Sequence, residues 1–254
     1  MAKTNVTTTN LKNYDIIALE SVDSTSRFLK DYVSENRPNK PLFCTTKKQT
    51  AGYGQQKRSW ITNKKSAIFS LAYPLYKDFV LSGLVSLHIA SLLHQTLTQL
   101  TADTLYLKWP NDIFNDSGKV AGILIEQVIK KDYRAFIIGI GINRDSPEII
   151  NEIASSSSTK PFEINDFFSL FHQKVQQSKL QHYGEQELNE YWEKHGFFSL
   201  GESVQVIQPD QTNTEVLKTE SGVYRGFDSH GHAKIEINGT MKFVASGQIS
   251  IRKI

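Results

Sequence analysis

The chain has 254 residues, of which 39% are hydrophobic, 22% are charged and one is a cysteine, and its formal net charge is +3. This length suffices for one large domain or for a medium domain with a small one, and so small a charge gives no reason to expect a nucleic-acid partner. The apolar stretches are far shorter than the roughly 20 residues that cross a bilayer. The first thirteen residues lack a secretory signal. We therefore expect a cytoplasmic protein with no membrane partner and no intrachain disulfide.

The N-terminal half combines short strands with two amphipathic helices. A strand is expected at 16–19, and Ser24 then stands where a helix N-cap is needed before apolar residues at helical spacing. Further strands are expected at 42–46 and 67–73, and a helix at 85–100. The segment 47–65 is rich in Gly and Gln and carries six basic residues and no acidic one. It is either a loop that binds an anion or a solvated surface loop.

Three apolar runs follow, at 104–108, 120–127 and 135–143, and the short turns between them favour antiparallel neighbours in one sheet. A polar linker at 155–161 precedes two more helices. We expect an α+β fold, with a mixed, mainly antiparallel sheet and helices on one side. From about residue 200 the apolar period changes to two, and Asn238-Gly239 is typical of a two-residue hairpin. The expected domains are residues 1–197 and a small C-terminal β-barrel at 198–254.

Two segments carry candidate chemistry. In Lys108-Trp-Pro-Asn-Asp112, Pro110 is expected to end the strand, so the chain would leave the sheet with Lys108 held by the last rigid backbone. Such a lysine is a compact cationic donor for a phosphate, and a surface lysine before an ordinary turn is the alternative. In the segment 49–60, Gly52 and Gly54 allow backbone N–H groups to approach a ligand. That segment is neither a Walker A loop nor a dinucleotide fingerprint.

Together, in this order, these segments resemble the biotin protein ligases over nearly the whole chain. The matching segments are Asp23-Ser24-Thr25, residues 49–54 with Trp60, Lys108 to Asp112, Lys119 to Leu124, and Gly139 to Asn143. The resemblance implies the class II synthetase-like catalytic domain of biotin and lipoyl ligases. It implies formation of biotinyl-5′-AMP from biotin and ATP with Mg²⁺. Transfer of biotin to a lysine of the biotin carboxyl carrier protein of acetyl-CoA carboxylase would follow.

The resemblance also implies roles for individual positions. Lys108 and Arg58 would be the catalytic cations, and Asp112 would lie near the metal ion. The implied biotin-binding residues are Ser24, Thr25, Ser26, Gln49, Tyr53, Gly54, Gln55 and Lys108. The implied nucleotide-binding residues are Gly52, Lys57, Arg58, Trp60, Asn111 and Asn143. For Asn143, a buried strand-end side chain satisfied by the backbone is an equal alternative.

The sequence departs from the family pattern at two places. Tyr53 and Gln55 stand where the family loop has arginines, and Lys57 stands where it has a glycine, so the strength with which the adenylate is held is left open. Only 23 residues precede Ser24. The winged helix-turn-helix of bifunctional relatives, and binding to DNA through it, are therefore not expected. Whether the protein is a monomer or a homodimer is left open.

Two other functions remain as alternatives. A lipoate or octanoyl ligase would share the fold, but its Arg-Arg-x-Gly-Gly-Gly loop is missing here. A non-catalytic nucleic-acid-binding module would need a platform of aromatic and basic side chains, which the C-terminal region does not show. The seven histidines, including His230 and His232, have no spacing typical of a metal site. We expect them to be solvated or in the core.

Overall fold

The computed structural model describes residues 6–60, 66–75, 82–144, 158–178, 185–209, 217–247 and 249–254. Its larger sheet has eight strands in the order β1-β2-β3-β4-β8-β7-β6-β5. The strands are β1 (Val6–Asn10), β2 (Asp15–Val22), β3 (Leu42–Gln49), β4 (Ala67–Pro74), β5 (Tyr106–Lys108), β6 (Asp112–Asn115), β7 (Gly118–Lys130) and β8 (Tyr133–Ile142). Only β2 and β3 pair in parallel, and the other neighbours are antiparallel. The predicted mixed, mainly antiparallel sheet is confirmed.

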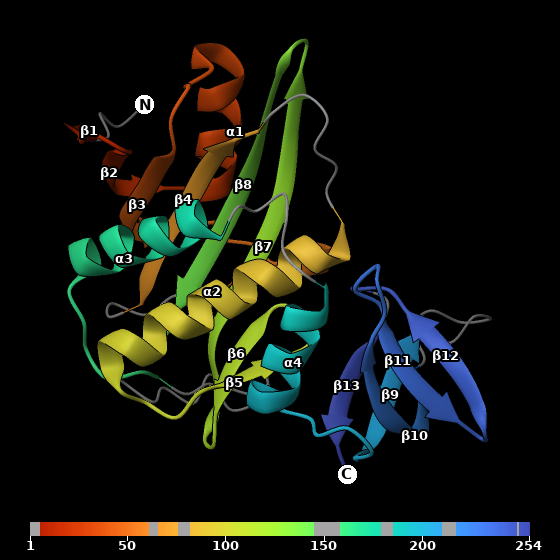
Figure 1. Ribbon diagram of the computed structural model, residues 1–254. Coiled ribbons are helices and arrows are strands. Elements are labelled where there is room, and N and C mark those ends of the chain that lie inside the picture. The colour runs from red at the N-terminus through yellow and green to blue at the C-terminus, as the bar shows by residue number, and fades with distance from the viewer. Residues whose placement is uncertain are drawn as a thin grey trace.

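Helices cover both faces of this sheet (Figure 1). They are α1 (Thr25–Asn36), α2 (Gly83–Thr101), α3 (Ile164–Gln177) and α4 (Glu185–His195). One apolar core lies between the sheet and α2, α3 and α4, and a smaller one lies between the sheet and α1. The prediction placed all helices on one side, and α1 departs from it. Because central strands of this sheet are buried on both faces, their sequences do not tell which face a given helix covers.

The two faces of β8 differ in side-chain size. Phe136, Ile138, Ile140 and Ile142 face the larger core, and Ile137 faces the core under α1. Successive side chains of a strand point to opposite faces, so Gly139 and Gly141 follow Ile137 on the α1 face. This face is therefore bare of side chains just beyond the N-terminus of α1. That bare area is the floor of the site described below.

The C-terminal segment forms a second antiparallel sheet, in the order β12-β11-β10-β9-β13. Its strands are β9 (Ser203–Pro209), β10 (Leu217–Phe227), β11 (Ala233–Ile237), β12 (Thr240–Val244) and β13 (Ser250–Lys253). The hairpin predicted at Asn238-Gly239 is confirmed: it joins β11 to β12, with φ of 51° and 73° at its two residues. Among the described pairings β12 and β13 are the edges of the sheet, so closure into a barrel stays a prediction.

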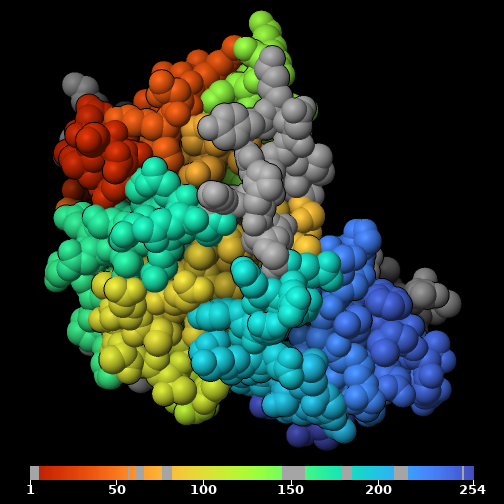
Figure 2. Space-filling model, viewed as in Figure 1, coloured from red at the N-terminus to blue at the C-terminus, as the bar shows by residue number. Residues whose placement is uncertain are grey.

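The second sheet packs beside α4 and shares the larger core (Figures 1 and 2). The ring of Trp192 in α4 contacts Phe227 at 5.8 Å, and Phe198 contacts Tyr224 at 5.5 Å. Trp109 donates a hydrogen bond from Nε1 to the carbonyl of Gly231 at 3.0 Å. The predicted division into 1–197 and 198–254 falls between α4 and β9 and stays a prediction.

The chain does not leave the sheet after Lys108. Instead, Trp109-Pro110, joined by a cis peptide bond, turns the chain back, and β6 pairs antiparallel with β5 so that Lys108 lies opposite Asp112. The prediction that the strand ends before Pro110 is confirmed, because β5 ends at Lys108, whereas the expectation that the chain then leaves the sheet is wrong. Pro110 sits in the turn, where its missing N–H interrupts no ladder.

Acid is expected to destabilise the protein through His88 in α2. Burial lowers the pKa of His88 from 6.5 to about 4. Its neutral form therefore fits the folded state, and stability is retained above pH 6.5 and lost as the pH falls towards 4. A shift of this size corresponds to roughly 3 kcal/mol. Urea unfolding of wild type and His88→Gln between pH 8 and pH 4 measures it, and the variant should lose less stability over this range.

Burial also lowers the pKa of His94 and of His172. The free energy of unfolding of His88→Gln should therefore still fall with falling pH, but less steeply than that of the wild type. The difference between the two proteins should be constant above pH 7, where His88 is neutral in both the folded and the unfolded chain. An equal pH dependence of the free energy of unfolding in wild type and His88→Gln would show that His88 does not cause the acid destabilisation.

Candidate active site

A pocket of about 570 Å³ opens over the bare glycines of the sheet. It is formed by the first turn of α1, the loop after β3, and the strands β4, β6, β7 and β8. Its described lining includes most of the residues that the sequence predicted, namely Ser24, Thr25, Ser26, Gln49, Tyr53, Gly54, Gln55, Arg58, Trp60, Asn111, Asp112 and Asn143. It also includes Lys119, which the sequence reasoning left without a role. The pocket is therefore the candidate active site.

Buried hydroxyl groups line one end of the pocket. Ser24 is the N-cap of α1, as predicted, and its side chain accepts a hydrogen bond from the backbone N–H of Arg27. Thr25 and Ser26 each form a hydrogen bond with the hydroxyl of Ser70 on β4, at 2.8 and 2.9 Å. These groups are almost fully buried, so the network is held in a fixed arrangement.

Gln49 completes this end of the pocket. Its Oε1 accepts a hydrogen bond from the backbone N–H of Thr25 at 2.9 Å, which fixes the side chain at the start of α1. A Cβ atom on Gly139 would lie 2.6 Å from the hydroxyl oxygen of Ser26. Only glycine at position 139 therefore leaves room for this hydroxyl cluster on the sheet.

Trp60 covers the middle of the pocket floor. A Cβ atom on Gly141 would lie 2.6 Å from Nε1 of Trp60, and one on Gly122 would lie 3.0 Å from Cζ3 of the same ring. The indole therefore rests on the backbone of β7 and β8, where Gly122 and Gly141 are paired. Its Nε1 is buried and has no hydrogen-bond partner among the described residues. A buried N–H without an acceptor is costly, so this donor indicates a ligand.

The loop between Gln49 and Trp60 is closed at its base by backbone hydrogen bonds. Trp60 donates from its N–H to the carbonyl of Gly52 at 3.0 Å, and Gly54 donates to the carbonyl of Arg58 at 2.8 Å. A Cβ atom on Gly52 would overlap Nε2 of Gln49. Gly52 is thus part of the loop's base, and it does not line the pocket.

Side chains of this loop reach the C-terminal sheet. Gln55 donates to the hydroxyl of Ser246 at 2.9 Å, and Gln56 donates to the carbonyl of Gly247, so the loop touches the turn before β13. Arg58 is exposed and donates to Oε1 of Gln56 at 2.8 Å. The side chain of Lys57 lies outside the described residues.

Tyr53 fastens the loop to the body of the protein. Its hydroxyl donates to Glu126 on β7 at 2.8 Å, and the Lys30 ammonium, which is paired with Glu126, lies 5.4 Å from the centre of the Tyr53 ring. Burial raises the pKa of Tyr53, so the phenol stays protonated and keeps its role as donor. Tyr53 thus supplies an uncharged hydrogen-bond donor at a position where the family has an arginine.

Tyr53→Phe is expected to loosen the loop, because it keeps the ring and removes the hydroxyl that contacts Glu126 and Lys30. A hydrogen bond to a charged group contributes about 1.5 to 3 kcal/mol. Amide hydrogen exchange in residues 50–60 should therefore become at least about tenfold faster. Tyr32→Phe, on α1 but away from the loop, is the matched control and should leave the exchange of this segment unchanged. Equal exchange in wild type and Tyr53→Phe would rule out the tether.

The lysine in the pocket is Lys119, at the start of β7. Its ammonium is 2.7 Å from the carboxylate of Asp112 and 5.3 Å from the centre of the Trp60 ring. Both side chains of the ion pair are partly exposed, at 29% and 23%. A ligand can therefore reach the ammonium group of Lys119.

Lys108 does not line the pocket. Its ammonium lies 4.2 Å from the centre of the Phe114 ring and 5.3 Å from that of Phe197. Burial lowers the pKa of Lys108; repulsion by Lys119 and Arg252 adds to this effect, while Asp112 opposes it. Lys108 is thus held against aromatic rings near the C-terminal sheet, whereas Lys119 faces the pocket.

Asn111 and Asn143 line the pocket on either side of Lys119. Asn111 donates from Nδ2 to the carbonyl of Ile123, and Asn143 donates from Nδ2 to the carbonyl of Lys119 at 3.2 Å. Asn143 is thus bonded to the backbone, as one interpretation held, and it also lines the pocket, so its binding role stays a prediction. These bonds use the amide nitrogens and leave the Oδ1 atoms as the groups that could meet a ligand or ion.

Comparison with known proteins agrees with the fold. The sequence model of the Biotin/lipoate A/B protein ligase family matches residues 18–143, the segment that contains the pocket residues from Ser24 to Asn143. Residues 18–143 therefore contain a domain that matches this family.

Similar proteins include bifunctional ligase/repressor proteins named BirA. The one from Salmonella typhimurium is 28% identical over 253 residues, which are 95% of this chain and 76% of the relative. The one from Escherichia coli is 27% identical over 248 residues, which are 93% of this chain and 74% of the relative.

Solved structures share the whole fold. Biotin protein ligase from Aquifex aeolicus in complex with biotin and ATP has a TM-score of 0.74 and 24% identity, and the match covers 96% of this chain and 100% of that one. Biotin acetyl coenzyme A carboxylase synthetase from Helicobacter pylori has a TM-score of 0.65 and 21% identity, with 91% and 100% covered. The second sheet belongs to the shared architecture, because the matches extend over nearly the entire chain.

Proposed function

We propose that the protein is an ATP-dependent biotin protein ligase. It forms biotinyl-5′-AMP from biotin and ATP and then transfers biotin to a lysine of a biotin carboxyl carrier protein, the type of acceptor found in acetyl-CoA carboxylase. The observation that carries the proposal is a single pocket with buried hydroxyls at one end, a reachable cation at the other, and the unpaired Trp60 N–H between them. The family, and the biotin and ATP bound to the Aquifex aeolicus ligase, support it.

The hydroxyl end fits the ureido group of biotin. A ureido group has one acceptor oxygen and two N–H donors, and hydroxyl groups can serve as both donor and acceptor. Thr25 and Ser26 are hydroxyls of this kind, and the amide of Gln49 adds a further donor and acceptor. The fixed network orients them before the ligand binds, which reduces the entropy cost of binding.

The cationic end of the pocket fits the two anionic groups that react, the carboxylate of biotin and the α-phosphate of ATP. Along β8, Gly139 lies under Ser26, Gly141 lies under Trp60, and Asn143 follows, so the site extends about 13 Å at 3.3 Å per residue. Lys119 lies at the far end and would hold the carboxylate of biotin and the α-phosphate of ATP. We assign it the role that the sequence pattern suggested for Lys108, because Lys119 is the one of the two that lines the pocket.

The reaction consists of two displacements. A carboxylate oxygen of biotin attacks the α-phosphorus of ATP, the P–O bond to the β-phosphate breaks, and pyrophosphate leaves. The acceptor lysine amine then attacks the acyl carbon, AMP leaves with the electron pair of the C–O bond, and the nitrogen loses a proton. Cations stabilise the charge that spreads over the phosphate oxygens in the first step. Lys119 and Arg58 are the described cations that line the site.

The donor set of the site is compatible with Mg²⁺. This ion is usually held by one or two carboxylates together with substrate phosphates, and it favours oxygen ligands. Asp112 supplies a carboxylate in the pocket, and Oδ1 of Asn111 and of Asn143 are amide oxygens nearby. When bound, the ion would neutralise charge on the phosphates of ATP. Asp112 would then exchange its contact with Lys119 for one with the ion.

We also propose that the protein acts in the cytoplasm, where its acceptor would be found. No helix among the described residues is both long and apolar enough to span a membrane.

Mass spectrometry of a purified carrier domain tests the function. After incubation with the protein, ATP, Mg²⁺ and biotin, the domain should gain one biotinyl group, and replacing its acceptor lysine with arginine should abolish the gain. Omission of ATP is the control for chemical labelling. A parallel reaction with lipoate or octanoate in place of biotin distinguishes the other branch of the family. Transfer of lipoate or octanoate but not of biotin would overturn the proposal.

A further inference from the structure

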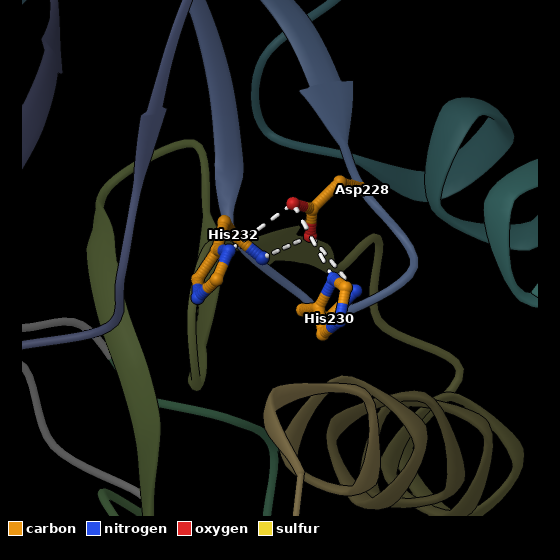
Figure 3. Close-up of side chains that lie close together, drawn as sticks. All are labelled: Asp228, His230 and His232. Atoms are coloured by element: carbon orange, nitrogen blue, oxygen red, sulfur yellow. Dashed lines mark hydrogen bonds and ion pairs between the residues drawn. The ribbon is translucent and has the colours of Figure 1, made fainter.

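Three side chains outside the pocket form a compact cluster in the turn between β10 and β11. In Figure 3 the carboxylate of Asp228 lies between the rings of His230 and His232. One candidate ligand atom from each residue lies within 4.8 Å of the others. The two rings are nearly parallel, with centroids 5.7 Å apart and an interplanar angle of 17°. The cluster is distant in sequence from the predicted site, and the mechanism above does not use it.

The two oxygens of Asp228 have different partners. Oδ1 accepts hydrogen bonds from the backbone N–H groups of His230 and His232, at 2.8 and 2.9 Å. Oδ2 lies 3.1 Å from Nδ1 of His232 and 3.9 Å from Nδ1 of His230. The first oxygen therefore shapes the turn, and the second faces two imidazole nitrogens. Because the two oxygens have separate partners, Oδ2 could bind an ion while Oδ1 keeps its hydrogen bonds to the turn.

The spacing of these donors matches that around a small metal ion. Zinc binds imidazole nitrogen and carboxylate oxygen at about 2.0 to 2.2 Å. In a tetrahedral arrangement, two such donors lie about 3.4 Å apart. The separations from Oδ2 of Asp228, 3.1 and 3.9 Å, lie on either side of this value, and the three ligand atoms all lie within 4.8 Å of one another. Small rotations of the two rings would bring all three donors to the same ion.

We propose that Asp228, His230 and His232 form a binding site for a divalent transition-metal ion, with Zn²⁺ as the best fit. Two imidazoles and one carboxylate suit zinc and similar ions, whereas Mg²⁺ and Ca²⁺ favour oxygen ligands alone. The side chain of His230 is 75% exposed and that of His232 is 38% exposed, so an ion can enter from solvent. Three protein ligands leave one position for water or another ligand.

The rest of the turn is fixed by contacts with the larger domain. The carbonyl of Gly231 accepts the hydrogen bond from Trp109, and the carbonyl of His230 lies so close to Gly83 that a Cβ atom there would overlap it. Trp109 lies in the turn between β5 and β6, which leads to Asp112 in the pocket. An ion bound to this turn would therefore stabilise the joint between the second sheet and the start of α2.

Calorimetric titration with Zn²⁺ alone tests the site. The protein is used at full length, free of any histidine affinity tag, after treatment with a chelator and in slightly alkaline buffer, because imidazole must be deprotonated to bind a metal. We expect one high-affinity ion per chain. His230→Gln/His232→Gln should weaken this binding by more than about tenfold. Asp228→Asn should weaken it too, and it retains Oδ1 as the acceptor for the turn.

Two controls separate the site from other effects. Glu236→Gln removes a carboxylate of the same sheet that is paired with Arg225, and it should leave Zn²⁺ affinity unchanged. Thermal unfolding in the presence of chelator should give similar midpoints for wild type and the double histidine variant, and Zn²⁺ should raise the midpoint of the wild type alone.

Equal Zn²⁺ affinity in wild type and the double variant would overturn the proposal, because any binding would then lie elsewhere, as at Asp112. No binding by the wild type would overturn it too. Neither result would affect the proposed ligase function, which the carrier-domain assay tests separately.

Discussion

Lys119→Met is expected to reduce the rate of biotinyl-adenylate formation by about 10²- to 10³-fold, the usual cost of losing one donor to a developing negative charge. Lys119 supplies a reachable ammonium in the pocket, paired with Asp112 at 2.7 Å. Methionine keeps most of the side-chain length and removes the charge. Pyrophosphate release at saturating biotin and ATP measures the adenylation step directly. Because the side chain is partly exposed, the free energy of unfolding should change little.

Lys108→Met is the matched control for this prediction. It removes the same charge from β5, which β6 separates from β7, and its ammonium lies against Phe114 and Phe197 instead of in the pocket. We expect it to reduce pyrophosphate release by less than about tenfold. The reverse result, with a large loss for Lys108→Met and a small one for Lys119→Met, would favour the sequence-based assignment over the geometric one.

The second large effect is expected at Gly141. In Gly141→Ala, the new methyl group would lie 2.6 Å from Nε1 of Trp60, so the indole must leave its place on the sheet. Overpacking of this kind typically costs about 1 to 3 kcal/mol of stability. The rate of adenylation should fall at least about tenfold, because Trp60 forms the middle of the site. Urea unfolding and pyrophosphate release measure the two consequences.

Gly54→Ala tests whether the loss of stability and activity expected for Gly141→Ala is specific to the floor of the pocket. Gly54 belongs to the same loop as Trp60, but a Cβ atom there would meet its nearest neighbour, the carbonyl of Arg58, at an ordinary 3.9 Å. This variant should keep wild-type stability and at least a third of wild-type activity. Unchanged activity in Gly141→Ala would mean that Trp60 has no part in holding the substrates.

The features that the sequence predicted well depend on neighbouring residues. The cap at Ser24, the antiparallel runs of β7 and β8 and the hairpin at Asn238-Gly239 are set by local capping, alternation and turn chemistry. The resemblance to the biotin protein ligases pointed to Ser24, Thr25 and Ser26, which line one end of the pocket. The position of that end on the sheet depends on the distant Ser70 and Gly139.

The features that the sequence missed depend on distant contacts. Lys108 and Lys119 are both half-buried lysines in strands, so their local patterns do not distinguish them. The two lysines differ in the aromatic ring that each ammonium contacts, which is Trp60 for Lys119 and Phe197 for Lys108. The cluster of Asp228, His230 and His232 is local instead, and it forms because the backbone N–H groups of both histidines bind Asp228, a turn geometry that residue spacing alone does not indicate.

The shared core of the two sheets limits how this protein can be divided. A cut between α4 and β9 would not release two finished units, because Trp192 would lose Phe227 and Trp109 would lose the carbonyl it binds. Each fragment would expose large aromatic surfaces to water, at about 25 cal/mol for every Å². The two parts should therefore melt together in a single transition. A C-terminal module from another ligase could be exchanged into this chain only if the aromatic residues on both sides of the joint were exchanged with it.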